Sequence, residues 1–158
     1  MNAETFEYVV HDYAPALLRT AFLYLKSTSE AEDVVQEVFI RYWQKNPRFL
    51  SDAARRAWLY KTTVNLCKDH LKSFWCTKRA ELKEDISYLP QEEHEILDCL
   101  MKLDEKYRIP LHLHYYDGYS IKEIAQILHI RTSTVGSRLH RGKEKLKQML
   151  GGNFDETL

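Results

Sequence analysis

Apolar residues recur at three- and four-residue intervals along nearly the whole chain, and this helical period is the feature that most limits the possible folds. No run alternates convincingly between apolar and polar side chains as a half-buried β-strand does. The spacing predicts an all-α fold. The expected helices cover residues 4–26 (with Pro15 as a potential bend), 30–45, 53–74, 92–102, 105–116, 121–128 and 133–149.

A polar connector, Cys76–Gln91, separates two groups of predicted helices. The formal net charge is 0, but it is unevenly distributed. From Cys76 to Lys106 there are nine acidic and five basic residues, whereas from Tyr107 to Leu150 there are three acidic and eight basic ones. With 158 residues, 44% of them hydrophobic, the chain can hold two small cores. We expect two small helical domains, residues 1–75 and 92–150, with a flexible linker over 76–91 and a tail over 151–158.

The predicted second helix has an apolar and a polar face. Ser29 and Glu32 have the spacing of a capping box at its start. The apolar face contains Ala31, Val34, Val35, Val38, Phe39 and Tyr42. The opposite side carries Asp33, Gln36, Glu37, Ile40 and Arg41. An isoleucine inside a polar stripe is either one stray apolar residue on a solvated surface or part of a docking surface.

The predicted third helix carries a cationic stripe. Its members follow the helical spacing i, i+4, i+7 and i+11 and are Lys61, Asn65, Lys68 and Lys72. The residues expected to face the core are Leu59, Thr62, Leu66 and Leu71. Cations around one amide side chain suit a phosphate backbone that flanks a base to be read. A lysine stripe is also typical of an ordinary soluble surface.

The strongest local pattern is the 30-residue segment Asp117–Leu146, DGYSIKEIAQILHIRTSTVGSRLHRGKEKL. Gly118 can end the preceding helix with left-handed backbone. Ser120 and Glu123 have capping-box spacing at the start of the next helix. Ala125 is small at a point where a second helix must cross closely. Two short helices with a tight turn between them favour a DNA-binding helix-turn-helix over an ordinary helical hairpin.

The last helix of this pattern is expected to follow a turn at His129 and to be capped by Thr132 or Ser133. Its buried face is predicted to contain Val135, Leu139, Gly142 and Leu146. Its free face carries Ser133, Ser137, Arg138 and Arg141. Hydroxyl groups at a helix start can bond phosphates or base edges, and arginines one turn further on can reach phosphates or guanine.

Three segments together resemble bacterial RNA polymerase sigma factors of the extracytoplasmic-function (ECF) subgroup. The segment similar to the family's core-polymerase-binding helix is EAEDVVQEVFIRYW. The segment similar to its promoter-melting and minus-ten-reading helix is RRAWLYKTTVNLCKDHLK. The segment similar to its minus-thirty-five-reading domain is LDEKYRIPLHLHYYDGYSIKEIAQILHIRTSTVGSRLHRGKEKL. The resemblance covers about residues 6–150 and implies a factor that directs promoter recognition, melting and transcription initiation.

The resemblance assigns roles to the patterns above: residues 1–75 would form a region-two-like domain and residues 92–150 a region-four-like domain. The implied contacts with core RNA polymerase are Asp33, Gln36, Glu37, Ile40 and Arg41. The implied minus-ten DNA contacts are Lys61, Asn65, Lys68, Asp69 and Lys72. The loop Phe49–Ala53 would help to hold an unstacked base. Trp58 and Tyr60 are candidates for base stacking, with a core role favoured for Trp58. The implied minus-thirty-five contacts are Thr132, Ser133, Thr134, Ser137, Arg138 and Arg141.

Two positions depart from the family pattern. His129 stands in the turn where the family often has glycine, which a left-handed backbone accepts less readily. Gly136 stands where the recognition helix often carries a basic residue, which removes one groove contact. Besides core polymerase and promoter DNA, the resemblance implies a third partner, because family members are commonly held inactive by an anti-sigma factor that is often membrane-anchored.

Catalytic and metal sites are not expected. No nucleophile–base set or phosphate loop is present. His112 and His114 point to different sides of a helix, and Cys67, His70 and Cys76 lack a fourth ligand. We therefore predict no enzyme activity, no metal, no cofactor and no small-molecule substrate.

Three cysteines without repeated spacing argue against a disulfide framework. No signal peptide and no apolar run of about 20 residues is recognisable, which favours a cytoplasmic protein. A stand-alone helix-turn-helix regulator is the alternative function. It accounts for residues 117–150 and leaves the first half of the chain without a role.

Overall fold

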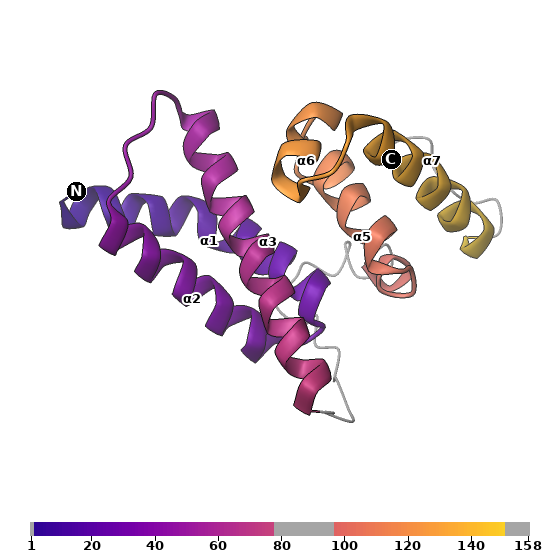
Figure 1. Ribbon diagram of the computed structural model, residues 1–158, viewed down its shortest axis with the longest axis horizontal. Helices are drawn as coiled ribbons and strands as arrows, with labels where there is room; N and C mark the ends of the chain where they lie inside the picture. The colour runs from indigo at the N-terminus through magenta and orange to yellow at the C-terminus, as the bar shows by residue number, and fades with distance from the viewer. Residues whose placement is uncertain (1, 78–96, 151–158) are drawn as a thin grey trace. The chain divides into compact units, whose positions relative to one another are not determined.

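The computed structural model describes residues 2–77 and 97–150, with side chains up to residue 73 in the first range (Figure 1). The described residues contain helices and no strand, so the predicted all-α fold is confirmed. They fall into two compact units, one within Met1–Glu84 and the other within Asp85–Leu158. Most of the predicted connector and the tail lie outside the described residues. The domain boundaries therefore stay a prediction, although Cys76 and Thr77 still belong to the third helix.

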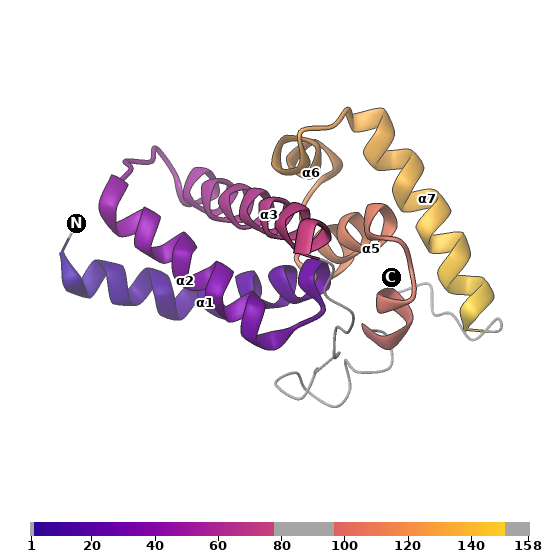
Figure 2. The same cartoon turned by 60° about the horizontal axis from the view of Figure 1, so that its bottom comes forward.

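The first unit consists of three helices that pack on one another (Figures 1 and 2). They are α1 (Ala3–Leu25), α2 (Thr28–Lys45) and α3 (Asp52–Thr77). Pro15 lies inside α1 and does not end it. Left-handed residues end the first two helices, Lys26 with φ 57° and Asn46 with φ 42°. The fully buried side chains that hold the unit together include Val9, Leu17, Phe22, Leu23, Leu25, Val38 and Leu59.

Helix α2 begins two residues earlier than predicted. Ser27, not Ser29, is the N-cap, and its hydroxyl accepts a hydrogen bond of 3.3 Å from the Glu30 amide. The S-x-x-E spacing occurs twice here, as Ser27–Glu30 and as the predicted Ser29–Glu32. Glu30 is buried and lies 3.3 Å from Nε2 of His70 in α3. A contact with a distant helix therefore distinguishes two possible starts that have the same local sequence pattern.

Helix α3 buries a slightly different face from the predicted one. Leu59 is buried as expected, but Thr62, Leu66 and Leu71 are only half-buried. The other buried positions are Tyr60, Thr63, Val64 and Cys67. The Thr63 hydroxyl donates to the Leu59 carbonyl oxygen at 2.8 Å, which satisfies it inside the core. Tyr60 is 2% exposed, so its ring is not accessible to a DNA base and that suggestion was wrong.

The second unit consists of helical residues 97–101 and the elements that follow them. These are α5 (Glu105–Leu111), the π-helix η1 (His112–Tyr116), α6 (Ile121–Leu128) and α7 (Thr132–Met149). The predicted helix 105–116 is thus an α-helix that widens into a π-helix, where the Asp117 amide donates to the His112 carbonyl oxygen at 3.1 Å. Gly118 follows with φ 77°, as predicted.

Helices α5 and α7 pack side by side with a glycine at their contact (Figures 1 and 2). All four residues of the predicted buried face of α7 are buried: Val135, Leu139, Gly142 and Leu146. A Cβ atom on Gly142 would lie 2.8 Å from Leu111 Cδ1 and 3.2 Å from Tyr107 Cβ. These distances are shorter than ordinary van der Waals contacts between carbon atoms. The absence of a side chain at residue 142 therefore allows α5 and α7 to approach as closely as they do.

Candidate functional site

Helix α2 presents a polar stripe away from its buried face. Asp33, Gln36 and Ile40 are exposed there, and Ile40 leaves 49% of its surface accessible although it is aliphatic. Glu37 and Arg41 lie on the same side, joined by an ion pair of 3.0 Å between Oε1 and Nε. The structure therefore places the five predicted polymerase-docking residues on one surface, and their role stays a prediction.

Trp43 extends this stripe and was missed from the sequence. It follows Gln36 by seven residues and Ile40 by three, which puts the three side chains on one side of α2. Trp43 is 47% exposed. Its ring packs edge-on against Phe6 with the centroids 5.1 Å apart, which restrains it. The i, i+4, i+7 spacing was the signal that could have found it.

Helix α3 exposes all five residues predicted to contact the minus-ten element. They are Lys61, Asn65, Lys68, Asp69 and Lys72. Within residues 2–77 and 97–150, no carboxylate forms an ion pair with the three lysines. Their ammonium groups therefore stay available to an anionic partner, and a single DNA strand is one such partner.

The loop before α3 has a fixed inner edge and an exposed tip. Phe49 stacks on Tyr42 with the ring centroids 6.4 Å apart and the planes at 6°, and its ring lies 6.2 Å from that of Trp58. The Arg55 guanidinium lies 5.8 Å from the Phe49 ring centroid. Beyond this cluster, Leu50 is fully exposed. Such a geometry suits a loop that holds a base outside its stack.

Arg55 provides a permanent positive charge beneath this loop. Burial acts to lower the pKa of Arg55, but a hydrogen bond to Tyr42 and the carboxylate of Asp52 raise it overall. The Asp52 oxygen lies 2.7 Å from Nη1 of Arg55. Burial also raises the pKa of the Tyr13 phenol, and Asp52 adds to that rise.

In the second unit, the helix-turn-helix has the predicted start and turn. The Ser120 hydroxyl accepts from the Glu123 amide at 3.1 Å, and the Glu123 carboxylate accepts from the Ser120 amide at 3.1 Å, which completes the capping box. His129 adopts the left-handed backbone at φ 56° and ends α6. A histidine therefore occupies the turn in the left-handed conformation that glycine adopts most readily.

The cap predicted for α7 was wrong. Arg131 is the N-cap residue, and it makes no side-chain capping bond. Thr132 and Ser133 are the first two residues of α7, which begins one residue earlier than predicted, and both are exposed. Neither hydroxyl caps α7, and both stay on its surface.

A groove of about 390 Å³ lies between α5 and the first half of α7. It brings together five of the six predicted minus-thirty-five residues and two residues of α5. Its lining consists of Lys106, Tyr107, Ser133, Thr134, Ser137, Arg138 and Arg141. Thr132 is the predicted residue that does not line it. Lys106 and Tyr107 were missed, because they precede the helix-turn-helix by about ten residues and only the packing of α5 on α7 brings them there.

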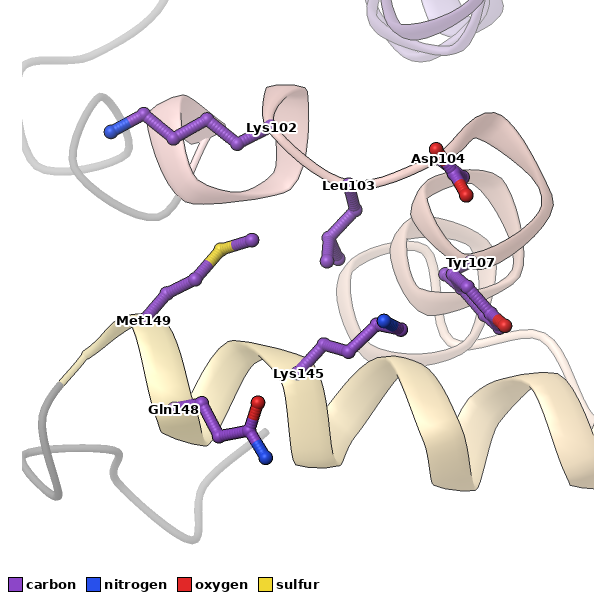
Figure 3. A pocket seen from close by; sticks show the side chains of 7 residues that line it. All are labelled: Lys102, Leu103, Asp104, Tyr107, Lys145, Gln148 and Met149. Carbon is purple, nitrogen blue, oxygen red and sulfur yellow. The ribbon is translucent and has the colours of Figure 1, made fainter.

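A second groove of about 330 Å³ follows the other half of α7 (Figure 3). Figure 3 shows Lys145 of α7 extending toward Tyr107 of α5, and its Nζ lies 5.6 Å from the centroid of that ring. Lys102, Asp104 and Met149 also line this groove. Its lining residues carry charges of both signs, in contrast to the groove at the start of α7.

The described residues contain no cluster of three or more His, Cys, Asp or Glu side chains that could hold a metal ion. Cys67 is fully buried, and His70 Nε2 contacts Glu30 of α2 at 3.3 Å. The side chain of Cys76 lies outside the described residues. His112 lies in the core with its Nε2 3.4 Å from an Asp117 carboxylate oxygen. None of the described helices has the length and apolar character that crossing a bilayer requires.

Comparison with known proteins identifies both units. Residues 9–75 match the family described as Sigma-70 region 2, and residues 93–146 match Sigma-70, region 4. The chain is 33% identical to the ECF RNA polymerase sigma factor SigL of Mycobacterium tuberculosis over 88% of this chain and 85% of that protein. It is 28% identical to ECF RNA polymerase sigma factor SigW of Bacillus subtilis over 94% of this chain and 90% of that protein.

Two solved structures share this fold. CnrH, in complex with the cytosolic domain of CnrY, matches with a TM-score of 0.71 and 27% identity over 97% of this chain and 92% of that one. The sigma factor RpoE of Bartonella quintana, in complex with the anti-sigma factor NepR, matches with a TM-score of 0.79 and 20% identity over 96% of this chain and all of that one. With the two sigma regions in order and a relative 33% identical along most of both lengths, the chain belongs to the family of ECF RNA polymerase sigma factors.

Proposed function

We propose that the protein binds core RNA polymerase and directs it to a narrow set of promoters, where it takes part in recognition, melting and initiation. The observation that carries this proposal is the presence of both sigma regions, in order, in one chain. In this role the protein acts by binding and catalyses no reaction itself. Because its target is the transcription machinery, its place of action is the cytoplasm.

The first unit would supply two surfaces. The stripe of α2 around Ile40 would dock on core polymerase, because an exposed aliphatic side chain beside charged residues suits a protein interface. The lysine stripe of α3 and the loop with Leu50 at its tip would hold the opened minus-ten strand. Flipping a base out of the duplex costs a few kcal/mol, so melting needs a surface that binds the open strand.

The second unit would bind the minus-thirty-five element through α7. Ser133, Ser137, Arg138 and Arg141 line one groove with hydroxyl and cationic groups, which are ligands for phosphates and base edges. Gly136 is half-buried and a Cβ atom there would meet nothing within 4 Å. It therefore offers no contact of its own, and the sequence preference rests on its neighbours.

An anti-sigma factor is the third partner that we propose. Two proteins of this fold were solved with partners, RpoE with the anti-sigma factor NepR and CnrH with the cytosolic domain of CnrY. A protein that covers the polymerase- and DNA-binding surfaces would keep this factor inactive. Co-purification from uninduced cells should recover such a protein. Free and active factor in those cells would count against it.

In vitro transcription with purified core polymerase and a genomic promoter library tests the main proposal. We expect specific transcripts only when both core polymerase and this protein are present. A stand-alone helix-turn-helix regulator would instead bind its operator tightly without polymerase. The absence of any specific transcript across the library would overturn the proposal.

A further inference from the structure

The groove at the start of α7 is lined by side chains of one charge sign. Three of its residues are cations, three are serine or threonine and the seventh is Tyr107. No acidic residue lines it, whereas Asp104 lines the neighbouring groove. Cations that gather around a concave surface without a carboxylate repel one another. An anionic ligand would relieve this repulsion.

Lys106 is the cation that reaches this groove from outside the helix-turn-helix. It is the second residue of α5, and its Nζ lies 5.1 Å from the ring centroid of Tyr107. A cation–π contact of this kind is attractive, so it restrains the lysine beside the groove. The same ring contacts Lys145 from the neighbouring groove at 5.6 Å.

The cations of the groove are not neutralised by the protein. Among the described residues, no carboxylate forms an ion pair with Lys106, Arg138 or Arg141. By contrast, Lys147 on the same helix has Glu144 Oε1 at 3.7 Å from its Nζ. The groove therefore keeps its positive charge for a partner, and Lys147 provides a charge-matched comparison outside it.

We propose that Lys106 is a DNA-positioning residue whose ammonium group binds one phosphate of the promoter backbone in this groove. The inference rests on the proposed function and adds a residue of α5 to the minus-thirty-five surface. An ammonium group binds phosphate as a compact point charge, whereas base reading favours the planar fork of arginine. Lys106 thus holds the duplex in register against α7, and it carries no sequence information itself.

The experiment uses the full chain assembled with core polymerase, on a promoter fragment that the wild-type holoenzyme selects from the genomic library. Lys106→Ala, Lys106→Arg and Lys147→Ala are compared in a salt titration of promoter binding. For Lys106→Ala we expect the slope of log Kobs against log salt to fall in magnitude by about 0.9, which corresponds to one phosphate contact. Lys106→Arg should retain the slope, and Lys147→Ala should change it by much less.

A second measurement locates the phosphate. Neutral methylphosphonates replace single phosphates, one position at a time, through the minus-thirty-five element. One substitution should weaken the wild-type complex by several-fold and leave the Lys106→Ala complex unchanged, because the contact is already lost. The order of preferred bases should be the same for both proteins.

The outcomes separate this inference from the proposed function. If the wild-type holoenzyme selects no promoter, the proposed function fails before Lys106 is tested. If it selects promoters but Lys106→Ala behaves like Lys147→Ala, the phosphate site is overturned and the function stands. A methylphosphonate effect that is the same in wild type and Lys106→Ala at every position would also overturn it. A changed base preference would show instead that Lys106 reads sequence.

Discussion

The two units build their candidate functional surfaces in different ways. In the first unit, the stripes around Ile40 on α2 and around Asn65 on α3 each belong to a single helix. In the second unit, the cationic groove is shared by two helices, because Lys106 and Tyr107 come from α5 and the other lining residues from α7. A stripe depends only on helical periodicity, whereas the groove also depends on how closely α5 and α7 pack.

This difference predicts different responses to mutation. A stripe should lose its function when one of its exposed residues changes, and its helix should stay folded. The groove should also lose its function when a buried residue changes the distance between its helices. Four substitutions in α2 and α7, taken from the largest expected effect to the smallest, test this contrast between stripes and groove.

The largest effect is expected for Ile40→Glu on the α2 stripe. If Ile40 anchors the interface with core polymerase, the change should weaken that binding by about 2 kcal/mol or more, as for an interface hot spot. The free energy of unfolding should move by less than about 0.5 kcal/mol, because the residue is exposed.

Lys45→Gln is the control for Ile40→Glu. It changes the charge by the same one unit at an exposed position about 140° round α2. Calorimetric titration with core polymerase and thermal unfolding measure the two quantities. A large fall in melting temperature for Ile40→Glu would place the residue in the core.

Gly142→Val should disrupt the cationic groove by pushing α5 and α7 apart. A side chain there collides with Leu111 and Tyr107, and overpacking of this kind costs about 1–3 kcal/mol of stability. Minus-thirty-five binding should fall, while binding to core polymerase through the first unit should persist. Gly136→Ala is the matched control, since a Cβ atom there meets nothing within 4 Å.

Because alanine favours a helix over glycine by about 1 kcal/mol, Gly136→Ala should stabilise the second unit. Chemical denaturation followed by circular dichroism measures both variants. Equal stability of the two variants would mean that the close approach of α5 and α7 is not limited by residue 142.

Arg141→Ala tests base reading within the groove. A true base contact should cost about 1–3 kcal/mol of promoter binding and relax the preference at one minus-thirty-five position. Arg138→Ala is examined beside it, because either arginine can reach a base edge. The measurement is promoter selection on a randomised minus-thirty-five element. Unchanged preference and activity for both variants would show that a different face of α7 enters the groove of the DNA.

The smallest effect is expected for Lys147→Ala. Its ion pair with Glu144 is exposed and of a kind that contributes about 0–1 kcal/mol. Promoter binding should weaken slightly and equally for all sequences, with a small loss of salt dependence. Filter binding at several salt concentrations on two promoters measures this. A change in preference between the two promoters would assign Lys147 a role in base reading.

The helices and the buried faces of α2 and α7 were predictable because they follow from the helical period of the local sequence. The face of α2 with Val38 and the face of α7 with Leu139 were both buried as expected. The capping box at Ser120 was predictable for the same reason, since all its partners lie within three residues. His129 was recognised as a turn residue, and its left-handed backbone is tolerated by histidine more than by most side chains.

The incorrect or missing predictions concern positions whose structure depends on residues far away in the sequence. Ser27 caps α2, and Glu30 in its first turn contacts His70, which is forty residues away. Tyr60 is buried by neighbouring helices that its own sequence does not reveal. Lys106 joins the groove only after α5 packs on α7. The positions of single helices could thus be predicted, and the surfaces built between helices could not.

The cationic groove at the start of α7 has no acidic lining residue, but it belongs to a chain whose formal net charge is zero. The net charge determines over what distance the protein attracts DNA. At physiological ionic strength the electric field of a fixed charge decays over about 8 Å. A chain without net charge adds no electrostatic attraction to DNA at longer distances. In the proposed role, the free factor would therefore spend little time bound to arbitrary stretches of the genome. Its residence on DNA would become long only where polymerase holds the proposed minus-thirty-five groove within a few ångströms of the backbone.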